Sequence, residues 1–231
     1  MDNRPIAVVI AVKELRGAKT RLAPVIDDDE RRALVLAMLT DTIAAAASAG
    51  VDRVMIVSPD KTVAATADDI GARIVVDRGD LLNDAFALGI DQALDIWPDS
   101  RILVLQADLP AARPESLAAA IERSAGHARS YIPDHSGTGT TALFLNIDHP
   151  SAANTLRFGA NSATEHRTRG AVDLTEGADR WPDLRMDVDT VDDLRAAQAI
   201  GVGAATSRVL ARLQLGEQTQ SPGVTAPLDG P

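Results

Sequence analysis

The sequence of 231 residues contains no cysteine, and only 3% of its residues are aromatic. The absence of cysteine excludes disulfide scaffolds, thiolate metal sites and cysteine nucleophiles. Because aromatic residues are scarce, the core must be built from Ala, Val, Leu and Ile, which suits helices packed on a parallel sheet better than an aromatic-rich barrel or sandwich. Hydrophobic residues still make up 45% of the chain, enough for the core of one domain.

Long hydrophobic runs are missing as well. The apolar run nearest the N-terminus, Ile6–Val12, has seven residues, whereas a helix that spans a bilayer needs about 20. No small-residue cleavage site follows this run, so the pattern of a secretion signal is not met. We therefore predict a cytoplasmic protein without a membrane partner.

Positive charge is in short supply. Asp and Glu outnumber Lys and Arg by 33 to 23, which gives a net charge of −10. A domain that grips a nucleic-acid backbone usually has the opposite balance, so nucleic acid is excluded as the expected partner. A small anionic ligand would need locally clustered cations or a bound metal to offset the surrounding negative field.

The first half of the chain alternates between buried strands and helices. The predicted strands are Ile6–Val12, Arg53–Val57, Arg73–Val76 and Arg101–Leu105, and the predicted helices run from Asp27 to about Ala49, from Ala64 to Ile70, from Leu82 to Trp97 and from Pro114 to about Ala125. This alternation predicts an α/β fold, a single Rossmann-like domain whose mostly parallel sheet is flanked by helices. In such sheets, ligands bind beyond the carboxyl ends of the strands.

The rhythm changes after about residue 127, where we expect a small irregular β-containing lobe. The predicted strands there are Ser130–Ile132, Thr140–Leu145, Ala171–Leu174 and Leu184–Asp187, and the predicted helices are Ala160–Arg169, Val191–Ile200 and Gly203–Leu213. We place the domain at residues 1–215. Residues 216–231 contain little that could be buried, and we predict a disordered C-terminal tail.

A cationic loop follows the first predicted strand. Lys13, Arg16, Lys19 and Arg21 place four cations within nine residues of a strongly acidic chain. Lysine as a point charge and arginine as a fork could hold a triphosphate at this end of the sheet. The alternative is a solvated loop whose cations balance the acidic residues 27–30, and the sequence alone does not decide between the two.

Three aspartates could hold a divalent metal. Asp108 follows the fourth predicted strand, and Mg²⁺ is usually held by one or two carboxylates together with phosphate oxygens. Asp187 and Asp189 lie two residues apart on an extended segment, so their side chains point the same way and need a cation between them. The alternatives are an Asp108 bonded to nearby backbone amides, and a cap of the next helix by Asp189 or Thr190, which leaves Asp187 unexplained.

Two loops rich in hydroxyl groups and glycine complete the candidate residues. Gly137–Thr140 and Arg157–Ser162 suit a carboxylate or a phosphate, although such residues more often form turns. The four histidines are too far apart in the chain for a metal-ligand motif. His166 is kept as an open candidate because it follows Ser162 by one helical turn.

Taken together, these segments resemble the guanylyltransferases of coenzyme F420 biosynthesis, which act on phosphoenolpyruvate or 2-phospho-L-lactate and are similar to molybdenum-cofactor guanylyltransferases. The resemblance is carried, in chain order, by Ala11-Val-Lys13, Ala18-Lys-Thr-Arg-Leu-Ala-Pro24, Leu105-Gln-Ala-Asp-Leu-Pro110, Gly137-Thr-Gly-Thr140, Arg157-Phe-Gly159, Ser162 and Asp187-Val-Asp-Thr190. It extends from about Ile6 to Ala211. This chain has Ala107 where the family often has glycine before the aspartate, and Ala160-Asn161 after Gly159, but neither change removes a functional group.

The resemblance implies a single nucleotidyltransferase domain that moves GMP from GTP to a small phosphorylated acid with the help of Mg²⁺, two ions being expected. By motif, Asp108, Asp187 and Asp189 are the metal carboxylates, and Asp108, Lys19 and Arg21 are the catalytic residues. The implied nucleotide-binding residues are Lys13, Lys19, Arg21 and Asn83, and the implied acceptor-binding residues are Thr140, Gly159 and Ser162. The alternative for Asn83 is a cap at the start of a helix.

The acceptor remains open between two acids that differ at one planar or tetrahedral carbon. The Ala- and Arg-rich composition is typical of a high-GC actinobacterium, which favours phosphoenolpyruvate, and the product could be handed to the downstream F420 transferase. Other hypotheses are a nucleotidyltransferase for a sugar phosphate or molybdopterin, and a noncatalytic GTP-binding module. The absence of a Leu-Ala-Gly-Gly loop after the first strand disfavours the former, and the three aspartates disfavour the latter.

Overall fold

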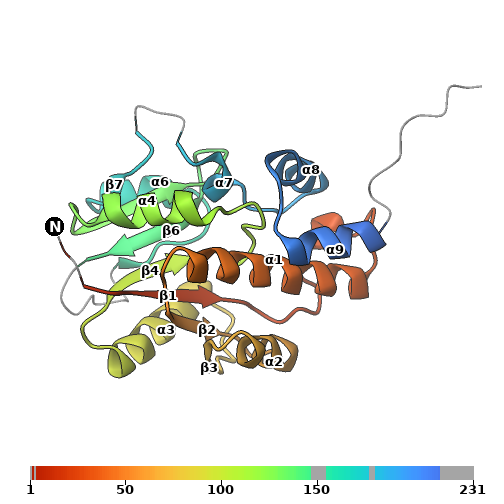
Figure 1. The fold of residues 1–231 in the computed structure, drawn as a ribbon, viewed down its shortest axis with the longest axis horizontal. Coiled ribbons are helices and arrows are strands. Elements are labelled where there is room, and N and C mark those ends of the chain that lie inside the picture. The colour runs from red at the N-terminus through yellow and green to blue at the C-terminus, as the bar shows by residue number, and fades with distance from the viewer. Residues whose placement is uncertain (1, 3, 147–154, 177–179, 214–231) are drawn as a thin grey trace, which may run out of the picture.

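The computed structural model describes residue 2 and residues 4–146, 155–176 and 180–213. Within these ranges, seven strands form one sheet in the order β3-β2-β1-β4-β6-β5-β7 (Figure 1). The strands are β1 Ile6–Ala11, β2 Arg53–Val57, β3 Arg73–Val75, β4 Arg101–Leu105, β5 Arg129–Pro133, β6 Thr140–Leu145 and β7 Val172–Asp173. The predicted tail lies outside the described residues.

The helices pack on both faces of the sheet. They are α1 Asp28–Ser48, α2 Lys61–Asp69, α3 Leu82–Ile96, α4 Pro114–Ser124, α6 Ser162–Thr168, α7 Pro182–Arg185, α8 Val191–Ile200 and α9 Ala204–Arg212, with a short 3-10 turn η1 at Thr20–Leu22. Among the described helices, none combines the length and the apolar character that crossing a bilayer would require.

Strand β1 lies in the middle of the sheet because it is apolar on both faces. All six of its residues are buried, and successive side chains point to opposite faces. Val8 and Ile10 join the core cluster that includes residues of α1 and α4, whereas Val9 joins the second cluster, with residues of α3 and α6. The predicted buried parallel strand is thereby confirmed.

The sheet is mostly parallel, as predicted. Strands β1, β2, β3 and β4 pair in parallel, and β7 runs parallel to β5. Strand β6 is antiparallel to both of its neighbours, β4 and β5. The segment expected to form a small β-containing lobe therefore contributes β5, β6 and β7 to the same continuous sheet.

One predicted strand is wrong. Leu184–Asp187 is predicted to be a short strand, but Pro182–Arg185 forms α7. Proline fits the first turn of a helix, where its missing N–H is not needed. The Asp183 carboxylate accepts hydrogen bonds from the Arg113 backbone N–H at 2.9 Å and from Ser116 Oγ at 3.0 Å, which fixes this turn against α4.

Helix α1 begins where its acidic first turn predicts. Asp27 and Glu30 form a capping box, in which each side chain accepts a hydrogen bond from the other residue's backbone N–H at 2.8 Å. Such caps satisfy N–H groups that have no partner inside the helix. Helix α9 packs along α1, and the Asp41 carboxylate of α1 accepts hydrogen bonds from the α9 backbone N–H groups of Ala205 at 2.9 Å and Thr206 at 2.7 Å.

Candidate active site

The candidate active site lies at the carboxyl edge of the parallel strands. Strand β1 has β2 on one side and β4 on the other, so the chain order reverses beside it, and ligands bind at such reversals. The loops after β1 and β4 carry Lys19 and Asp108. Because β6 is antiparallel to β4, its first residue, Thr140, also lies at this edge.

Two cavities meet this edge of the sheet and share Gln106. The larger, of about 640 Å³, is lined by Arg21, Leu82, Gln106, Asp134, His135, Ser136, Thr138, Gly139, Thr140, Gly159, Ala160, Asn161, Ser162, Asp187, Asp189, Thr190 and Asp193. The smaller, of about 310 Å³, is lined by residues 11–19, Val35 and residues 106–108. Nine of the ten predicted site residues line these two cavities, and Asn83 lines neither. The nine are Lys13, Lys19, Arg21, Asp108, Thr140, Gly159, Ser162, Asp187 and Asp189.

Lys19 connects two of the three predicted metal carboxylates. Its ammonium contacts Asp108 Oδ2 and lies 2.7 Å from Asp189 Oδ1. Burial disfavours the charged ammonium, but the two carboxylates together raise the Lys19 pKa above its ordinary value. Burial likewise opposes ionisation of Asp189, whereas Lys19 and then Arg21 lower its pKa. Lys19 is therefore a cation held between the carboxyl groups of Asp108 and Asp189.

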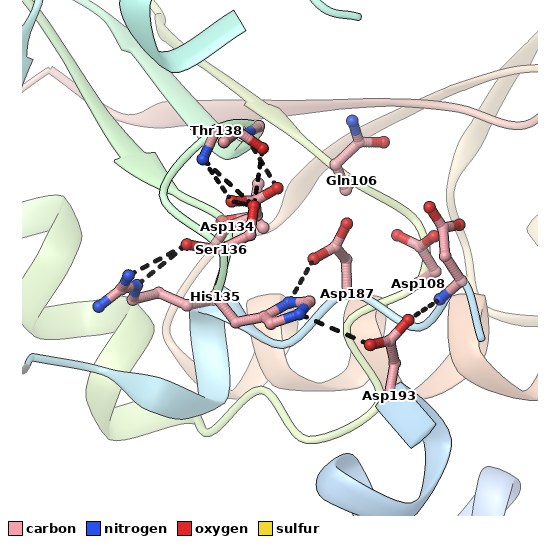
Figure 2. A network of polar contacts seen from close by, with 12 residues as sticks. Gln106, Asp108, Asp134, His135, Ser136, Thr138, Asp187 and Asp193 are labelled. Carbon is pink, nitrogen blue, oxygen red and sulfur yellow. Dashed lines mark hydrogen bonds and ion pairs between the residues drawn. The ribbon is translucent and has the colours of Figure 1, made fainter. Parts of the chain in front are cut away.

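Asp187 lies next to this cluster in a much less favourable environment. Burial first, and then the negative charges of Asp108, Asp134 and Asp189, raise the pKa of Asp187 to about 7. The buried Oδ1 atoms of Asp108 and Asp187 accept no hydrogen bond. Figure 2 shows His135 beside the Asp187 carboxylate, with Nδ1 at 3.5 Å from Oδ1. A buried carboxylate oxygen without a donor is costly unless a cation compensates it.

The carboxylate oxygens of these aspartates are suitable ligands for a divalent cation, although they do not surround one completely. Over the described ranges, no three acidic or histidine side chains are grouped tightly enough to hold a metal ion by themselves. Lys19 lies among them instead. An open set of carboxylates is the arrangement expected when substrate phosphates complete the coordination of Mg²⁺.

The predicted acceptor-binding residues lie together. Ser162 Oγ donates a hydrogen bond to Thr140 Oγ1 at 3.1 Å, and the Ser162 backbone N–H donates to the Gly159 carbonyl at 3.2 Å. All three residues line the larger cavity. The structure thus brings the two loops that the sequence singled out, 137–140 and 157–162, to one wall of a single cavity.

The remaining cations lie at the border of the site. Arg21 is largely exposed, and its Nη1 is 3.7 Å from Asp189 Oδ2. Lys13 Nζ donates to the carbonyls of Gly79 at 2.8 Å and Leu81 at 3.1 Å, which anchors the loop after β3. Contact of Lys13 or Arg21 with a nucleotide phosphate stays a prediction.

Asn83 has a partner that its position in the sequence did not suggest. Its side chain donates to the Phe158 carbonyl at 3.0 Å and accepts from the Phe158 backbone N–H at 2.8 Å. The alternative role as a helix cap is wrong, because Leu81 occupies the N-cap position of α3. Contact of Asn83 with guanine stays a prediction.

Asp134, which is not among the predicted site residues, shapes the loop between β5 and β6. Its carboxylate accepts hydrogen bonds from Ser136 Oγ at 2.8 Å, from the Thr138 backbone N–H at 3.0 Å and from the Gly139 backbone N–H at 2.9 Å (Figure 2). A Cβ on Gly139 would collide with this carboxylate. Asp-x-Ser-Gly at the end of a strand is a turn signal that could have revealed it.

Thr190, not Asp189, caps α8. Thr190 Oγ1 accepts from the Asp193 backbone N–H at 3.2 Å, and Asp193 Oδ2 accepts from the Thr190 and Asp189 backbone N–H groups at 2.7 and 3.1 Å. The cap thus uses neither the Asp187 nor the Asp189 carboxylate. The Thr-x-x-acid spacing was the available signal for Asp193.

Comparison with known proteins identifies the family. The family described as "Guanylyl transferase CofC like" matches residues 6–221. The chain belongs to this family. It is 45% identical over 211 residues to the phosphoenolpyruvate guanylyltransferase of Mycolicibacterium gilvum (strain PYR-GCK), covering 89% of this chain and 94% of that one. A second phosphoenolpyruvate guanylyltransferase, from Mycolicibacterium smegmatis, is 45% identical over 210 residues, 89% of this chain and 90% of the relative.

Solved structures support the fold of this guanylyltransferase family member. A protein of Desulfovibrio desulfuricans G20, described as a candidate nucleotide-diphospho-sugar transferase, superposes with a TM-score of 0.68 over 90% of this chain and 96% of its own, at 18% identity. The predicted family, the α/β fold and the enzyme class, a nucleotidyltransferase, are confirmed.

Proposed function

We propose that this enzyme transfers GMP from GTP to phosphoenolpyruvate, with Mg²⁺ held by Asp108, Asp187 and Asp189. The observation that carries the proposal is the convergence of these three carboxylates and Lys19 beside a cavity that Thr140, Gly159 and Ser162 also line. The names of relatives that cover about nine tenths of the chain support the choice of GTP and phosphoenolpyruvate.

The smaller cavity and its border are assigned to GTP. Lys13 and Lys19 line this cavity, beyond the first strand of the sheet, where α/β folds hold nucleotide phosphates. Arg21 lies at the border and can reach a phosphate as a fork. Asn83 retains one amide N–H beyond the hydrogen bonds that it shares with Phe158, and we assign that hydrogen to the nucleotide.

The reaction needs charge neutralisation more than proton transfer. One phosphate oxygen of the acceptor bonds to the α-phosphorus of GTP as the bond from that phosphorus to the bridging oxygen breaks, and diphosphate leaves with the electrons of that bond. A phosphate monoester is largely ionised near neutral pH, so no general base is required. The ammonium of Lys19 and the guanidinium of Arg21 stabilise the crowded negative charge and align the phosphates. A divalent ion on the aspartates would add charge neutralisation at the phosphate oxygens.

The first experiment identifies the acceptor. The purified protein is mixed with GTP, Mg²⁺ and either phosphoenolpyruvate or 2-phospho-L-lactate, and the coupled product is identified by mass alongside diphosphate release. We expect product with phosphoenolpyruvate. A parallel reaction includes the downstream F420 transferase, the proposed recipient, to trap the product. GTP binding without diphosphate release for any acid would contradict the proposal and favour a noncatalytic module.

The second experiment tests the carboxylates. Asp108→Asn and Asp187→Asn each keep the shape of the side chain and remove its charge, so we expect a loss of turnover of at least about a hundredfold, as when a group that stabilises charge in the transition state is removed. Asp192→Asn is the matched control, because Asp192 is an exposed acid whose ion-pair partner is Arg195. Near-normal turnover of Asp108→Asn with an intact fold would contradict the assigned role.

A further inference from the structure

His166 is a buried histidine that the proposed chemistry does not use. It lies on α6 with 1% of its surface exposed, against the ring of Phe158 at a centroid distance of 5.3 Å. Both of its ring nitrogens have partners. Nε2 is 3.2 Å from the Arg157 backbone nitrogen, and Nδ1 is 3.0 Å from Thr140 Oγ1.

These partners determine which ring nitrogen carries the hydrogen. A backbone N–H can only donate, so His166 Nε2 must accept from Arg157 and carries no hydrogen. The neutral ring then has its hydrogen on Nδ1, which donates to Thr140 Oγ1. Burial, followed by the positive charges of Arg157 and Arg169, lowers the pKa of His166 to about 4, so the ring is neutral near pH 7.

Thr140 therefore receives two hydrogen bonds. One comes from His166 Nδ1, and the other comes from Ser162 Oγ at 3.1 Å. A hydroxyl oxygen has two lone pairs and one hydrogen, so both lone pairs are in use and the hydrogen must point away from both donors. Thr140 lines the larger cavity, and no hydrogen bond in the described structure has Thr140 Oγ1 as its donor.

We propose that His166 is a positioning residue, which together with Ser162 orients the Thr140 hydroxyl so that it donates its hydrogen to an anionic oxygen of the acceptor acid. The inference rests on the proposed function for the identity of that acid. The second bond, from the Arg157 backbone to Nε2, ties the segment leading to Gly159 to the same ring. His166 thus couples the two loops that form the acceptor wall without touching the acceptor itself.

Two substitutions of His166 separate its hydrogen bond to Thr140 from its hydrogen bond to the Arg157 backbone. In His166→Asn, the side-chain amide lies where Nδ1 was and can still donate to Thr140. In His166→Gln, the longer side chain reaches the Nε2 position, so it can accept from the Arg157 N–H but leaves Thr140 without that donor. A role in packing alone predicts no advantage of the shorter side chain, because asparagine leaves the larger void.

Steady-state kinetics then test the proposal. We expect His166→Gln to raise the KM for phosphoenolpyruvate by about tenfold, the effect of one lost hydrogen bond, with the KM for GTP unchanged. His166→Asn is expected to stay within about threefold of the wild type. In a Thr140→Val background, which lacks the hydroxyl, His166→Gln should have no further effect on the KM for the acid. Equal loss in both single variants, or full additivity in the double variant, would overturn the proposal.

A second measurement does not depend on turnover. In protein labelled with ¹⁵N-histidine, the ring nitrogens of His166, assigned by their loss in His166→Asn, should show the neutral tautomer with hydrogen on Nδ1. A hydrogen on Nε2 overturns the proposal whatever the kinetics of the variants. Wild-type protein with the expected tautomer but no product with any acid would instead contradict the proposed function, so the two failures are distinguishable.

Discussion

Ionisation of the Asp187 carboxyl opposes folding. Its pKa in the folded protein is about 7, against an ordinary value of 3.8. A raised pKa in the folded state means that this group adds stability at low pH, and that the stability is lost as the pH rises through about 7. The full effect is of the order of a few kcal/mol.

Asp187→Asn should therefore stabilise the metal-free protein above neutral pH. In a chelating buffer at about pH 8, we expect its melting temperature to exceed that of the wild type by several degrees, and the difference to shrink towards about pH 5. Thermal unfolding at the two pH values measures this. A difference that does not change with pH would contradict the assigned ionisation.

His166 has the opposite dependence on pH. Its pKa falls from 6.5 to about 4 in the folded protein, so its contribution to stability is present above about pH 6.5 and is lost as the pH falls towards 4, by up to roughly 3 kcal/mol. Because Asp187 stabilises over the same acid range, the wild-type curve alone shows only the sum. We expect His166→Asn to lose less stability than the wild type between about pH 6.5 and 4.5, and parallel denaturation curves would contradict this.

Among the elements, α3 packs so closely on the sheet that it requires a glycine. A Cβ on Gly89 would lie 2.5 Å from Val9 Cγ1 and 2.6 Å from Val57 Cγ2, and both valines are buried in strands. Alanine would favour the helix by about 1 kcal/mol. Overpacking in a rigid core costs about 1–3 kcal/mol, so the clash should outweigh the gain.

We therefore expect Gly89→Ala to lower the free energy of unfolding by about 1 kcal/mol or more, measured by chemical denaturation. Gly126→Ala is the matched control. The nearest atom to a Cβ there is 3.9 Å away, so its effect should stay within about 0.5 kcal/mol. Equal effects of the two substitutions would show that α3 can move away from the sheet.

The sequence predicts the elements whose signals are local. Strand β1 is one continuous apolar run rich in β-branched residues, and α1 begins at an acidic capping box, so both could be placed without knowledge of the rest. The strand predicted at residues 184–187 is wrong because a segment of four residues is too short for its sequence to tell a strand from a helical turn. Asp183 is held by groups of α4, and that information is not local.

In the candidate site, too, some features follow from local sequence signals and others depend on the folded structure. The carboxylate side chains of Asp108, Asp187 and Asp189 indicate a metal site. The predicted carboxyl ends of the parallel strands indicate where ligands bind. Three contacts in the site depend on side chains that meet only after folding. They are the contact of Lys19 with Asp108, the hydrogen bonds of Asn83 with Phe158 and the hydrogen bond of His166 with Thr140. Asn83 and Phe158 are separated by 75 positions in the chain, and no pattern of nearby residues announces such a pair.

At the scale of the whole molecule, the net charge of −10 attracts any cation. A test of Mg²⁺ binding must therefore distinguish binding at one site from general screening of the negative charge. We expect millimolar Mg²⁺ to raise the melting temperature by a few degrees beyond NaCl of equal ionic strength, because a ligand that binds only the folded state stabilises it. Asp187→Asn should lose this excess, whereas Asp192→Asn should keep it. The same rise with NaCl in the wild type would show that screening alone acts.

The reversed direction of β6 has a consequence for how enzymes of this shape diversify. Since β6 runs against β4, the wall that we assign to the acid is the tip of a hairpin, residues 134–139, together with the loop before α6, whereas the nucleotide is assigned to loops of the parallel strands. A hairpin tip can change in length and composition without altering the register of the strands behind it. Selection for a new acid could therefore act on one end of one hairpin and leave the machinery for handling GTP intact.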